Sequence, residues 1–301
     1  AAEHDPGLRL PISGRAQGFA ETVAENPRLV GYNGSFLVIR QLEQDAAGFR
    51  DFCRREGARL DGAFPDLPLL TDADSMADYV GAKMIGRWQD GSSLVRNPYL
   101  AASRLKRITG RDPMAAASRP ESRPADMAAP TIEAAIAHPE EADAPTVTPD
   151  NDFLFGTEDP QGVRCPYGSH VRRVNPRESL SPGSNDQIAI SNRHRVIRVG
   201  RGYLGEDGKT TAGLMFMCLN GDIERQFEFI QQTWMGSAKF HGLTAEVDPI
   251  AGNAMAGRRG FTIPSRRGPV GLDPLPRFVT MRGGGYFFLP GRQILSFLAG
   301  S

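Results

Sequence analysis

The sequence has few cysteines, no excess of charge and no long apolar run, and each absence argues against a class of protein. Its three cysteines, Cys53, Cys165 and Cys218, are far apart and form no C-x-x-C pair, so neither a disulfide framework nor a zinc site is indicated. The 35 basic residues are matched by 35 acidic ones, so no net field attracts nucleic acid or an anionic membrane. No stretch approaches the ~20 apolar residues that a membrane span requires.

The compartment stays open on these grounds. Sparse, unpaired cysteines favour a reducing compartment such as the cytoplasm. The first residues show no signal peptide, but a targeting signal could precede Ala1, so the sequence is also compatible with secretion.

The chain does contain enough apolar residues for a sizeable core, in one large domain or two ordinary ones. Its 301 residues are 40% apolar and 23% charged, as in globular proteins. Residues 1–32 are punctuated by Gly and Pro without a clear period, which predicts an N-terminal extension. Residues 111–150 are rich in Ala, Pro and acidic residues, which predicts an inserted surface loop within a domain of residues 33–301.

Between these segments the hydrophobic periodicity predicts an α+β fold. The expected elements in chain order are a strand over 35–40, a helix over 44–56, a helix within 69–88 capped by Thr71 or Asp72, strands over 193–200 and 211–221, a helix over 222–235 capped by Asp222, a pair of strands within 277–290 bent at three glycines, and a short helix over 292–300. This order predicts an antiparallel sheet with helices on one face, which is the ferredoxin-like arrangement.

The segment "CPYGSHVRRVNPR", residues 165–177, places one histidine among several arginines. An isolated loop histidine is usually satisfied locally, but Arg172, Arg173 and Arg177 supply planar donor forks that suit carboxylates or phosphates. Haem needs both groups, because its iron takes an axial imidazole and its two propionates take cationic partners. His170 is therefore a candidate haem ligand. Arg173 and Arg177 are the propionate candidates, and Arg172 is expected to point into solvent if the segment is extended.

The same segment resembles the C-P-x-G-[AS]-H-[IV]-R-R-x-N-P-R motif of the dye-decolorising peroxidases, haem enzymes built from two ferredoxin-like halves. Further matches follow in the family's order: "NGSFLVIRQLEQDAAGF", "MIGRWQDGSSL", "NDFLFGTEDPQGVRCP", "RHRVIRVGRGY", "GLMFMCLNGDIERQFEFIQQTWM", "EVDPIAG" and "RGGGYFFLPG". The resemblance covers about residues 30–300 apart from the insert. It implies a fold of the dimeric α+β barrel type, haem b as cofactor, hydrogen peroxide as one substrate, and a dye, phenol or similar bulky reductant as the other.

The resemblance also assigns roles residue by residue. His170 resembles the proximal iron ligand, and Asp248 resembles the carboxylate that accepts a hydrogen bond from the ligand's other ring nitrogen. Arg198 resembles the distal arginine, a fixed cation that stabilises negative charge developing on the leaving peroxide oxygen. Leu214 and Phe216 alternate on one face of an apolar strand and resemble residues that line the distal pocket.

Several of these assignments have alternatives. Asp248 also fits a structural turn, and Leu214 and Phe216 also fit a core strand. A slip in register would make Arg195 or Arg201 the distal arginine instead.

Two other histidines are rival iron ligands. His194 is the first, because it precedes the distal arginine by four residues on the predicted strand, and His241 is the weaker second. Aromatic residues that could relay electrons to the surface, although each is more simply a core residue, are Trp88, Tyr203, Trp234 and Tyr286.

The chain departs from the family pattern in two places. The family's G-x-x-D-G motif, whose aspartate exchanges protons on the distal side, has no match: residues 48–52 end in phenylalanine within a predicted helix, residues 87–91 lack the leading glycine, and the spacing in 205–208 is too short. Residues 198–205 also lack the family's proline before the aromatic residue. The residues before Asn33 are too few for the missing half, although they could be its remnant.

These features predict a haem peroxidase whose distal aspartate comes from a second polypeptide, separately encoded or cleaved, because a half-domain would expose an apolar sheet edge. Loss of the missing half is the other explanation, and a homo-oligomer stays possible. The alternative function is a non-catalytic haem-binding subunit. An arginine-rich nucleic-acid module is disfavoured by the neutral charge balance, and no membrane association is predicted.

Overall fold

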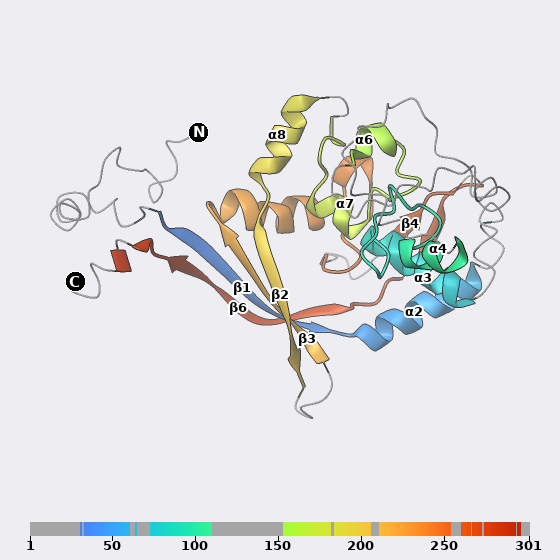
Figure 1. The fold of residues 1–301 in the computed structure, drawn as a ribbon, viewed down its shortest axis with the longest axis horizontal. Helices are drawn as coiled ribbons and strands as arrows, with labels where there is room; N and C mark the ends of the chain where they lie inside the picture. The colour runs from blue at the N-terminus through green and yellow to red at the C-terminus, as the bar shows by residue number, and fades with distance from the viewer. Residues whose placement is uncertain are drawn as a thin grey trace. The chain divides into compact units, whose positions relative to one another are not determined.

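The structure is a computed structural model that describes residues 31, 33–60, 64, 73–109, 153–181, 184–205, 211–253, 260–265, 267–272, 274–292 and 294–295. Its elements in chain order (Figure 1) are β1 (Ser35–Gln44), α2 (Ala46–Arg59), α3 (Ala73–Ile85), α4 (Ala102–Thr109), α6 (Phe155–Glu158), α7 (His170–Val174), α8 (Asn185–Arg193), β2 (Ile197–Leu204), β3 (Thr211–Asn220), η5 (Glu224–Glu228), η6 (Ile230–Met235), η7 (Phe240–Gly242), β4 (Phe261–Ile263), β5 (Val270–Leu272) and β6 (Val279–Leu289).

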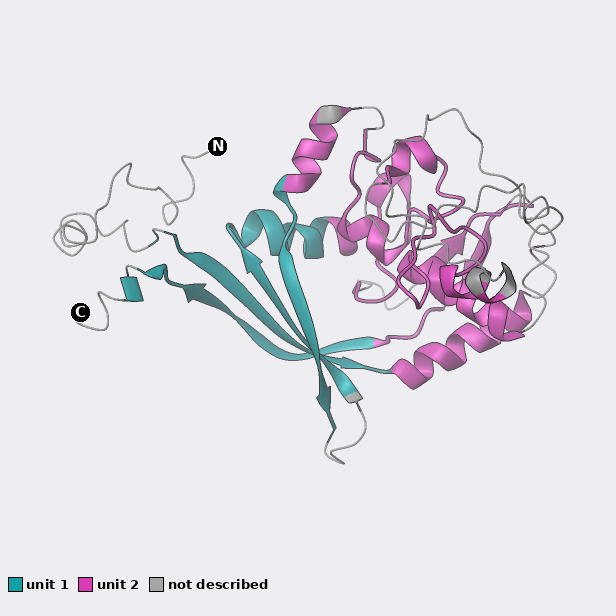
Figure 2. Cartoon of the chain, viewed as in Figure 1, with its two compact units in different colours: residues 1–45, 193–233, 279–301 teal, residues 46–192, 234–278 magenta. Residues whose placement is uncertain are grey.

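The chain divides into two compact units, each assembled from segments that are far apart in the sequence (Figure 2). Unit 1 comprises residues 1–45, 193–233 and 279–301, and unit 2 comprises residues 46–192 and 234–278.

Unit 1 is built on a four-stranded antiparallel sheet. The strand order is β2-β3-β1-β6, so the first and third of its strands along the chain lie in the centre and the second and fourth lie at the edges. A helical segment follows the hairpin of β2 and β3, and β6 returns beside β1 (Figure 1). This is the ferredoxin-like arrangement, so the predicted α+β fold class is confirmed.

One face of this sheet is covered by the helical segment after β3. Arg40 on β1 and Phe216 on β3 lie opposite each other and share this face with Tyr286 on β6. The ring of Phe227 from η5 lies 6.2 Å, centroid to centroid, from both Phe216 and Tyr286. The guanidinium of Arg40 lies over the rings of Phe227 and Tyr286, at 5.2 and 4.9 Å from their centroids.

The opposite face of the sheet is apolar and exposed. Ile197, Leu219 and Phe287 lie in one row across the strands, and Val199 and Leu289 lie in the rows beside it. Their exposed fractions range from 36% for Leu289 to 76% for Ile197. These five residues, called the open face below, form an apolar patch of the kind that marks a binding surface.

The C-terminal strand differs from the sequence prediction. Within residues 277–290 the structure has one strand, β6 (Val279–Leu289), rather than a pair bent at the glycines. A side chain at Gly284 would come within 2.2 Å of the Ile39 carbonyl oxygen, so the missing side chain lets β6 stay close to β1. The irregularity is a register shift between Gln41 and Leu42, which leaves Arg282 between the paired positions Met281 and Gly283.

The helix after β3 begins as expected, because Asp222 accepts a hydrogen bond from the Arg225 amide at 2.9 Å. Its backbone is wound more widely than an α-helix, with π-type hydrogen bonding in η5 and η6. Strand β2 begins at Ile197, later than the predicted residue 193, because α8 continues to Arg193.

Unit 2 packs its helices around a separate core. Helices α2 and α3 lie in contact, and a side chain at Gly57 would come within 2.8 Å of the Ala77 amide nitrogen, so the glycine permits this close approach. Phe278 packs edge-on against Phe49 and Phe52 from α2, with centroids 5.1 and 5.5 Å away. The helix predicted within 69–88 is confirmed as α3, with its apolar stripe buried.

Some predictions fall on parts of the chain that the structure does not describe. These are the extension before residue 31, both candidate caps of α3, the insert over 111–150 and most of the closing helix. All three cysteines are buried and free. Within the described residues, no helix is both long enough and apolar enough to cross a membrane.

Gly86 ends α3 in a conformation and a packing environment that exclude a side chain. It has φ +95°, and its amide donates to the Ala82 carbonyl, as in a glycine that terminates a helix. A side chain there would come within 3.0 Å of the Val171 Cβ and 3.3 Å of the Cys165 Sγ. We expect Gly86→Ala to lower the free energy of unfolding by roughly 2 kcal/mol, measured by urea denaturation.

Gly91 provides the matched control. It has φ +88°, but no atom lies within 4 Å of the position of an added side chain. Gly91→Ala therefore isolates the backbone strain from the clash, and we expect it to lower stability by about half as much. Equal losses in the two variants would contradict the close packing between the end of α3 and α7.

Candidate functional site

A histidine and a buried aspartate form the centre of the candidate site in unit 2. His170 Nδ1 lies 2.8 Å from Asp248 Oδ2, although the two residues are 78 positions apart in the chain. The Asp248 side chain is fully buried, whereas 31% of the His170 side chain is exposed. The structure therefore joins the two residues that the sequence suggested as a pair.

Asp248 holds its position through its second carboxylate oxygen. Oδ1 accepts hydrogen bonds from the amides of Ile250 and Ala251 at 2.9 and 2.8 Å, and the Asp248 amide donates to the Met235 carbonyl at 2.9 Å. Burial alone raises the pKa of Asp248, but the charge and hydrogen bond of His170 and these two amides together lower it below its usual value. The turn role and the histidine partner role predicted as alternatives are thus both present in one carboxylate.

This arrangement fixes which nitrogen of His170 carries the proton. An ionised carboxylate can only accept hydrogen bonds, so Nδ1 must donate, and in the neutral ring the lone pair then lies on Nε2. A histidine that ligates a metal through one nitrogen commonly donates its other N–H to a carboxylate. The donor set therefore fits an iron ligand at His170 Nε2.

The local sequence explains why the site begins a short helix. Segment 170–174 forms α7, and Pro176 ends it, because the residue before a proline is disfavoured in the helical region. Ser169 does not cap α7 with its side chain; its hydroxyl donates instead to the Lys83 carbonyl at the end of α3, at 2.5 Å. This contact fixes the first turn of α7 to α3.

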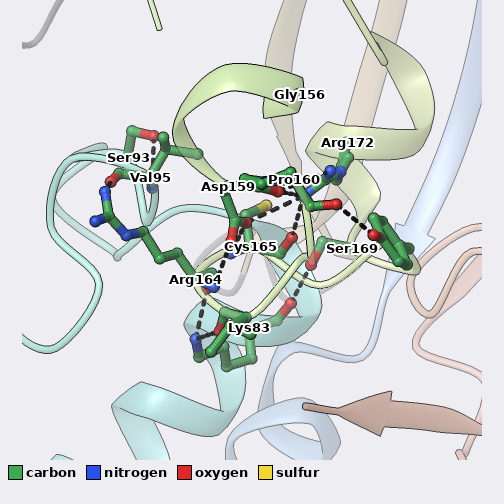
Figure 3. A network of polar contacts seen from close by, with 12 residues as sticks. Lys83, Ser93, Val95, Gly156, Asp159, Pro160, Arg164, Cys165, Ser169 and Arg172 are labelled. Atoms are coloured by element: carbon green, nitrogen blue, oxygen red, sulfur yellow. Dashed lines mark hydrogen bonds and ion pairs between the residues drawn. The ribbon is translucent and has the colours of Figure 1, made fainter. Parts of the chain in front are cut away.

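A buried polar network holds the loop that leads into α7 (Figure 3). Asp159 is its centre: its carboxylate accepts from the amides of Arg164 and Cys165 at 3.0 and 2.8 Å and pairs with Arg172 at 3.0 Å. Arg172 also donates to the Cys165 carbonyl at 2.8 Å. Each charge in the network therefore has an opposite charge or a hydrogen-bond partner, as burial requires.

Lys83 is the second buried cation of this network. Its Nζ donates to the carbonyls of Val163 and Arg164, at 2.9 and 2.5 Å, and lies 4.9 Å from the centroid of the Tyr79 ring. Burial lowers the pKa of Lys83 to about 8. Burial also raises the pKa of Cys165 to about 11, so this thiol is protonated at neutral pH.

The sequence did not reveal Lys83 or Asp159 as site residues. Each lies far from His170 along the chain, and a single lysine or aspartate within an ordinary helix or loop carries no motif. The one available signal was the segment "NDFLFGTEDPQGVRCP", which contains Asp159, but nothing in it identified this carboxylate as the partner of Arg172.

The prediction for Arg172 is wrong. The residue was expected in solvent on the assumption that the segment is extended, but the segment is helical and Arg172 is fully buried. Its guanidinium lies between the rings of Phe155 and Tyr167, 4.6 Å from each centroid, and pairs with Asp159.

The structure gives Arg173 contacts that the propionate prediction did not foresee. Arg173 is also fully buried, and its guanidinium donates to four backbone carbonyls, of Gly168, Trp234, Ser237 and Glu246. A carboxylate ligand would have to compete with all four for its donors.

Arg177 lies in a different environment. It is half-buried. Its guanidinium donates to the Phe153 carbonyl at 2.6 Å and lies 3.9 Å from the centroid of the Phe153 ring. Its backbone has φ +54°, a left-handed conformation that a non-glycine residue adopts only when its surroundings hold it there. Its role as a propionate partner stays a prediction.

The distal candidates belong to unit 1, on the sheet face covered by η5. Arg198 on β2 is exposed and lies opposite Cys218, so it points to the same side of the sheet as Leu214 and Phe216. Arg201 lies opposite Met215 and points to the other side. The register therefore separates Arg198 from Arg201 and groups it with the two apolar candidates.

The rival histidines have other environments. His194 precedes β2 instead of lying on it; its ring stacks on Phe229, with centroids 4.1 Å apart, and Nδ1 contacts the Arg225 carbonyl oxygen. His241 stacks on Tyr167 with centroids 4.2 Å apart, and burial lowers its pKa. Neither of these described contacts pairs a histidine with a carboxylate, as Asp248 pairs with His170.

Two segments that superficially matched a distal aspartate motif have structural roles. Asp51 lies on the exposed side of α2 and forms an ion pair with Arg54 at 3.3 Å. Asp90 accepts hydrogen bonds from the amides of Ser92 and Ser103, at 3.0 and 2.8 Å. Rejecting both segments is consistent with these contacts, whereas residues 206–208 lie outside the described part of the chain.

Comparisons with known proteins point to one family. The multifunctional dye peroxidase of Amycolatopsis sp. is 28% identical over 286 residues, which is 87% of this chain and 48% of that protein. A dye-decolorizing peroxidase of Mycetinis scorodonius is 28% identical over 323 residues, covering 98% of this chain and 53% of that protein. This chain is similar to the dye-decolorising peroxidases.

Solved structures agree, although no family model matches the chain. An ancestral D-type dye-decolorizing peroxidase gives a TM-score of 0.61 at 26% identity, over 87% of this chain and 50% of that one. The Amycolatopsis enzyme gives a TM-score of 0.56, also at 26% identity. The sequence resemblance to dye-decolorising peroxidases is thereby confirmed, and the chain spans about half the length of the curated relatives it matches.

The buried amine of Lys83 should make the stability of the fold depend on pH. Its pKa is about 8 in the folded chain and 10.5 as a model amine, so between these values the unfolded chain binds more protons. Lys83 therefore contributes a rise in the free energy of unfolding with pH across this window, by up to about 1 kcal/mol per pH unit. Urea denaturation at pH 7.5, 8.5 and 9.5 measures the slope.

Lys83→Met should lose this contribution and so show a less positive slope than the unmodified chain, because it removes the titrating amine. Lys239 is exposed, so Lys239→Met removes a lysine charge without touching a buried amine and should keep the slope of the unmodified chain. If Lys83→Met and the unmodified chain had the same slope, the buried charge would not be the source of the pH dependence.

Proposed function

We propose that the chain is the haem-ligating part of a peroxidase that reduces hydrogen peroxide while oxidising dyes, phenols or similar bulky reductants. The observation that carries the proposal is the pair of His170 and the buried Asp248, 2.8 Å apart, in a chain similar to dye-decolorising peroxidases. Haem b, when bound, would supply the iron at which peroxide is cleaved and would accept electrons from the reductant.

In this proposal His170 binds the iron through Nε2, and Asp248 acts as its positioning residue. The carboxylate keeps the proton on Nδ1 and makes the imidazole a stronger electron donor, which favours the oxidised metal. Because Asp248 is fully buried, water does not weaken this hydrogen bond. Arg177 stays a candidate for a propionate, since its guanidinium is half-buried.

On the distal side the proposal assigns Arg198 to the charge that develops on the leaving peroxide oxygen, and Leu214 and Phe216 to the apolar lining. An exposed guanidinium on an antiparallel strand, beside two apolar side chains of the same face, suits these roles. The distal carboxylate is expected from a polypeptide segment outside this sequence. That carboxylate would accept a proton from peroxide and return it to the leaving oxygen.

The open face supports a second polypeptide as the source of that segment. Five apolar side chains are exposed across the sheet of unit 1, and the chain spans about half the length of its curated relatives. A partner that carries another sheet would bury these side chains, as sheets pack face to face in layered folds. A homo-oligomer formed through the same face is the alternative occupant.

Replacement of His170 tests the iron ligand. We expect His170→Ala to lose most of the Soret absorbance per protein after haem reconstitution, because no axial imidazole remains. Asp248→Asn should retain the band but bind haem ~10–100-fold more weakly, since it removes the partner of the ligand and not the ligand. His194→Ala is the matched control and should leave the spectrum unchanged; loss of the band in this variant alone would overturn the assignment.

The catalytic proposal and its alternative, a non-catalytic haem-binding subunit, differ in turnover. We expect the native complex, characterised by intact mass, to contain a second polypeptide and to oxidise a dye with peroxide, whereas the isolated chain binds haem with little turnover. Ile197→Glu should release the partner because it charges the open face. Met281→Glu, an equally polar change on the other face of the sheet, should not. Bound haem without turnover in the complex would favour the non-catalytic subunit.

A further inference from the structure

We propose that Arg173 is a positioning residue that sets the His170–Asp248 hydrogen bond by tying together the two segments that carry this pair. The inference rests on the proposed function only in treating the pair as an iron ligand and its partner.

The contacts of Arg173 reach both segments directly. Its Nε donates to the Gly168 carbonyl at 3.2 Å, two residues before His170. Its Nη2 donates to the Glu246 carbonyl at 2.6 Å, two residues before Asp248. One rigid, planar group therefore spans the two backbone segments whose separation determines the distance between the imidazole and the carboxylate.

The third anchor of Arg173 is the end of η6. Its Nη1 donates to the carbonyls of Trp234 and Ser237 at 2.8 and 3.0 Å, so a cation satisfies carbonyls at the C-terminal end of a helical segment. The neighbouring Met235 carbonyl accepts the Asp248 amide at 2.9 Å. Arg173 and Asp248 are thus attached to the same helix end, which fixes one relative to the other.

The two segments are already in close contact where Arg173 joins them. A side chain at Gly168 would come within 2.9 Å of Glu246 Oε2 and 3.1 Å of the Phe261 ring. The two segments therefore have little room to move closer together, and the Arg173 hydrogen bonds oppose their separation. A change in either constraint would move the carboxylate relative to the imidazole.

Only an arginine can make this set of contacts. A lysine carries a single nitrogen at the end of its side chain and cannot donate to four carbonyls that surround a planar fork. The guanidinium also lies 5.0 Å from the centroid of the Phe240 ring, in a fully buried position. Burial lowers the pKa of Arg173 to about 10, so it remains charged at neutral pH.

Arg172 is the natural control, because it is the adjacent residue, equally buried and also paired. Its hydrogen bonds go to Asp159 and the Cys165 carbonyl, and none that the structure describes reaches the segment before Asp248. Loss of Arg172 should destabilise the loop before α7 without acting on the carboxylate.

The test measures the pair itself in the haem-free full-length chain. In protein labelled with ¹⁵N-histidine, the Nδ1–H proton of His170 should give a low-field signal that exchanges slowly with water and is absent from His170→Ala. We expect Arg173→Lys and Arg173→Met to shift this signal upfield and to raise its exchange rate about 10-fold or more, because the hydrogen bond to the charged Asp248 is lengthened. Arg172→Lys should keep the native signal, and circular dichroism identifies the variants that fold.

Arg173→Lys preserves the charge and is the variant more apt to fold, so the outcome does not depend on Arg173→Met. A native signal in the folded Arg173 variants would overturn the inference. In haem-loaded protein, Arg173→Lys should move the iron midpoint potential in the same direction as Asp248→Asn, and the double variant should match Asp248→Asn alone. Additive shifts would instead indicate that Arg173 acts independently of Asp248.

These readouts separate the two proposals. If the unmodified chain shows the slow Nδ1–H signal but takes up no haem, the proposed function fails while the role of Arg173 is still decided by the signal. If haem binds through His170 and the Arg173 variants leave both signal and potential unchanged, the role of Arg173 fails alone.

Discussion

The hydrogen bond between His170 and Asp248 requires a carboxylate that is entirely removed from water, and burying such a charge costs free energy. Such a charge is tolerated only when hydrogen bonds and an opposite charge replace its hydration. Asp248 receives two backbone amides and the imidazole N–H, so all of its acceptors that the structure describes point to defined donors. The fold around the pair can be understood as the set of constraints that keeps these donors in place.

Two buried arginines divide that task along α7. Because α7 is helical, the consecutive residues Arg172 and Arg173 leave it in different directions. Arg172 points towards Asp159 and the loop before the helix, and Arg173 points towards the end of η6 and the segment before Asp248. The first arginine holds the loop before α7, and the second joins the segments that carry His170 and Asp248. A run of arginines that looks like an anion site in the sequence is thus largely internal scaffold.

The sequence predicted the fold and the pair but not this division of labour. Strand and helix periodicity is a local property, so β1, α3, β3 and the capped helix at Asp222 could be recognised from short windows. The motif resemblance located His170 and Asp248, because each lies in a distinctive segment. The burial of Arg172 could not be foreseen, since its partners are a carboxylate 13 residues away and two aromatic rings. The three glycines of β6 were misjudged for a similar reason: the close approach of β1 to Gly284 is a tertiary property.

Unit 1 differs from unit 2 because its sheet leaves an apolar surface, the open face, uncovered. In unit 2 the buried cations described above have a carboxylate or backbone carbonyls as partners inside the unit, whereas unit 1 leaves Ile197, Phe287 and their neighbours exposed. Covering such side chains removes apolar surface from water, which is the contribution that favours a partner at this face. In the proposed function, one second polypeptide would both supply the distal carboxylate and cover the open face. This common requirement is the physical reason to treat the partner and the distal acid as a single question.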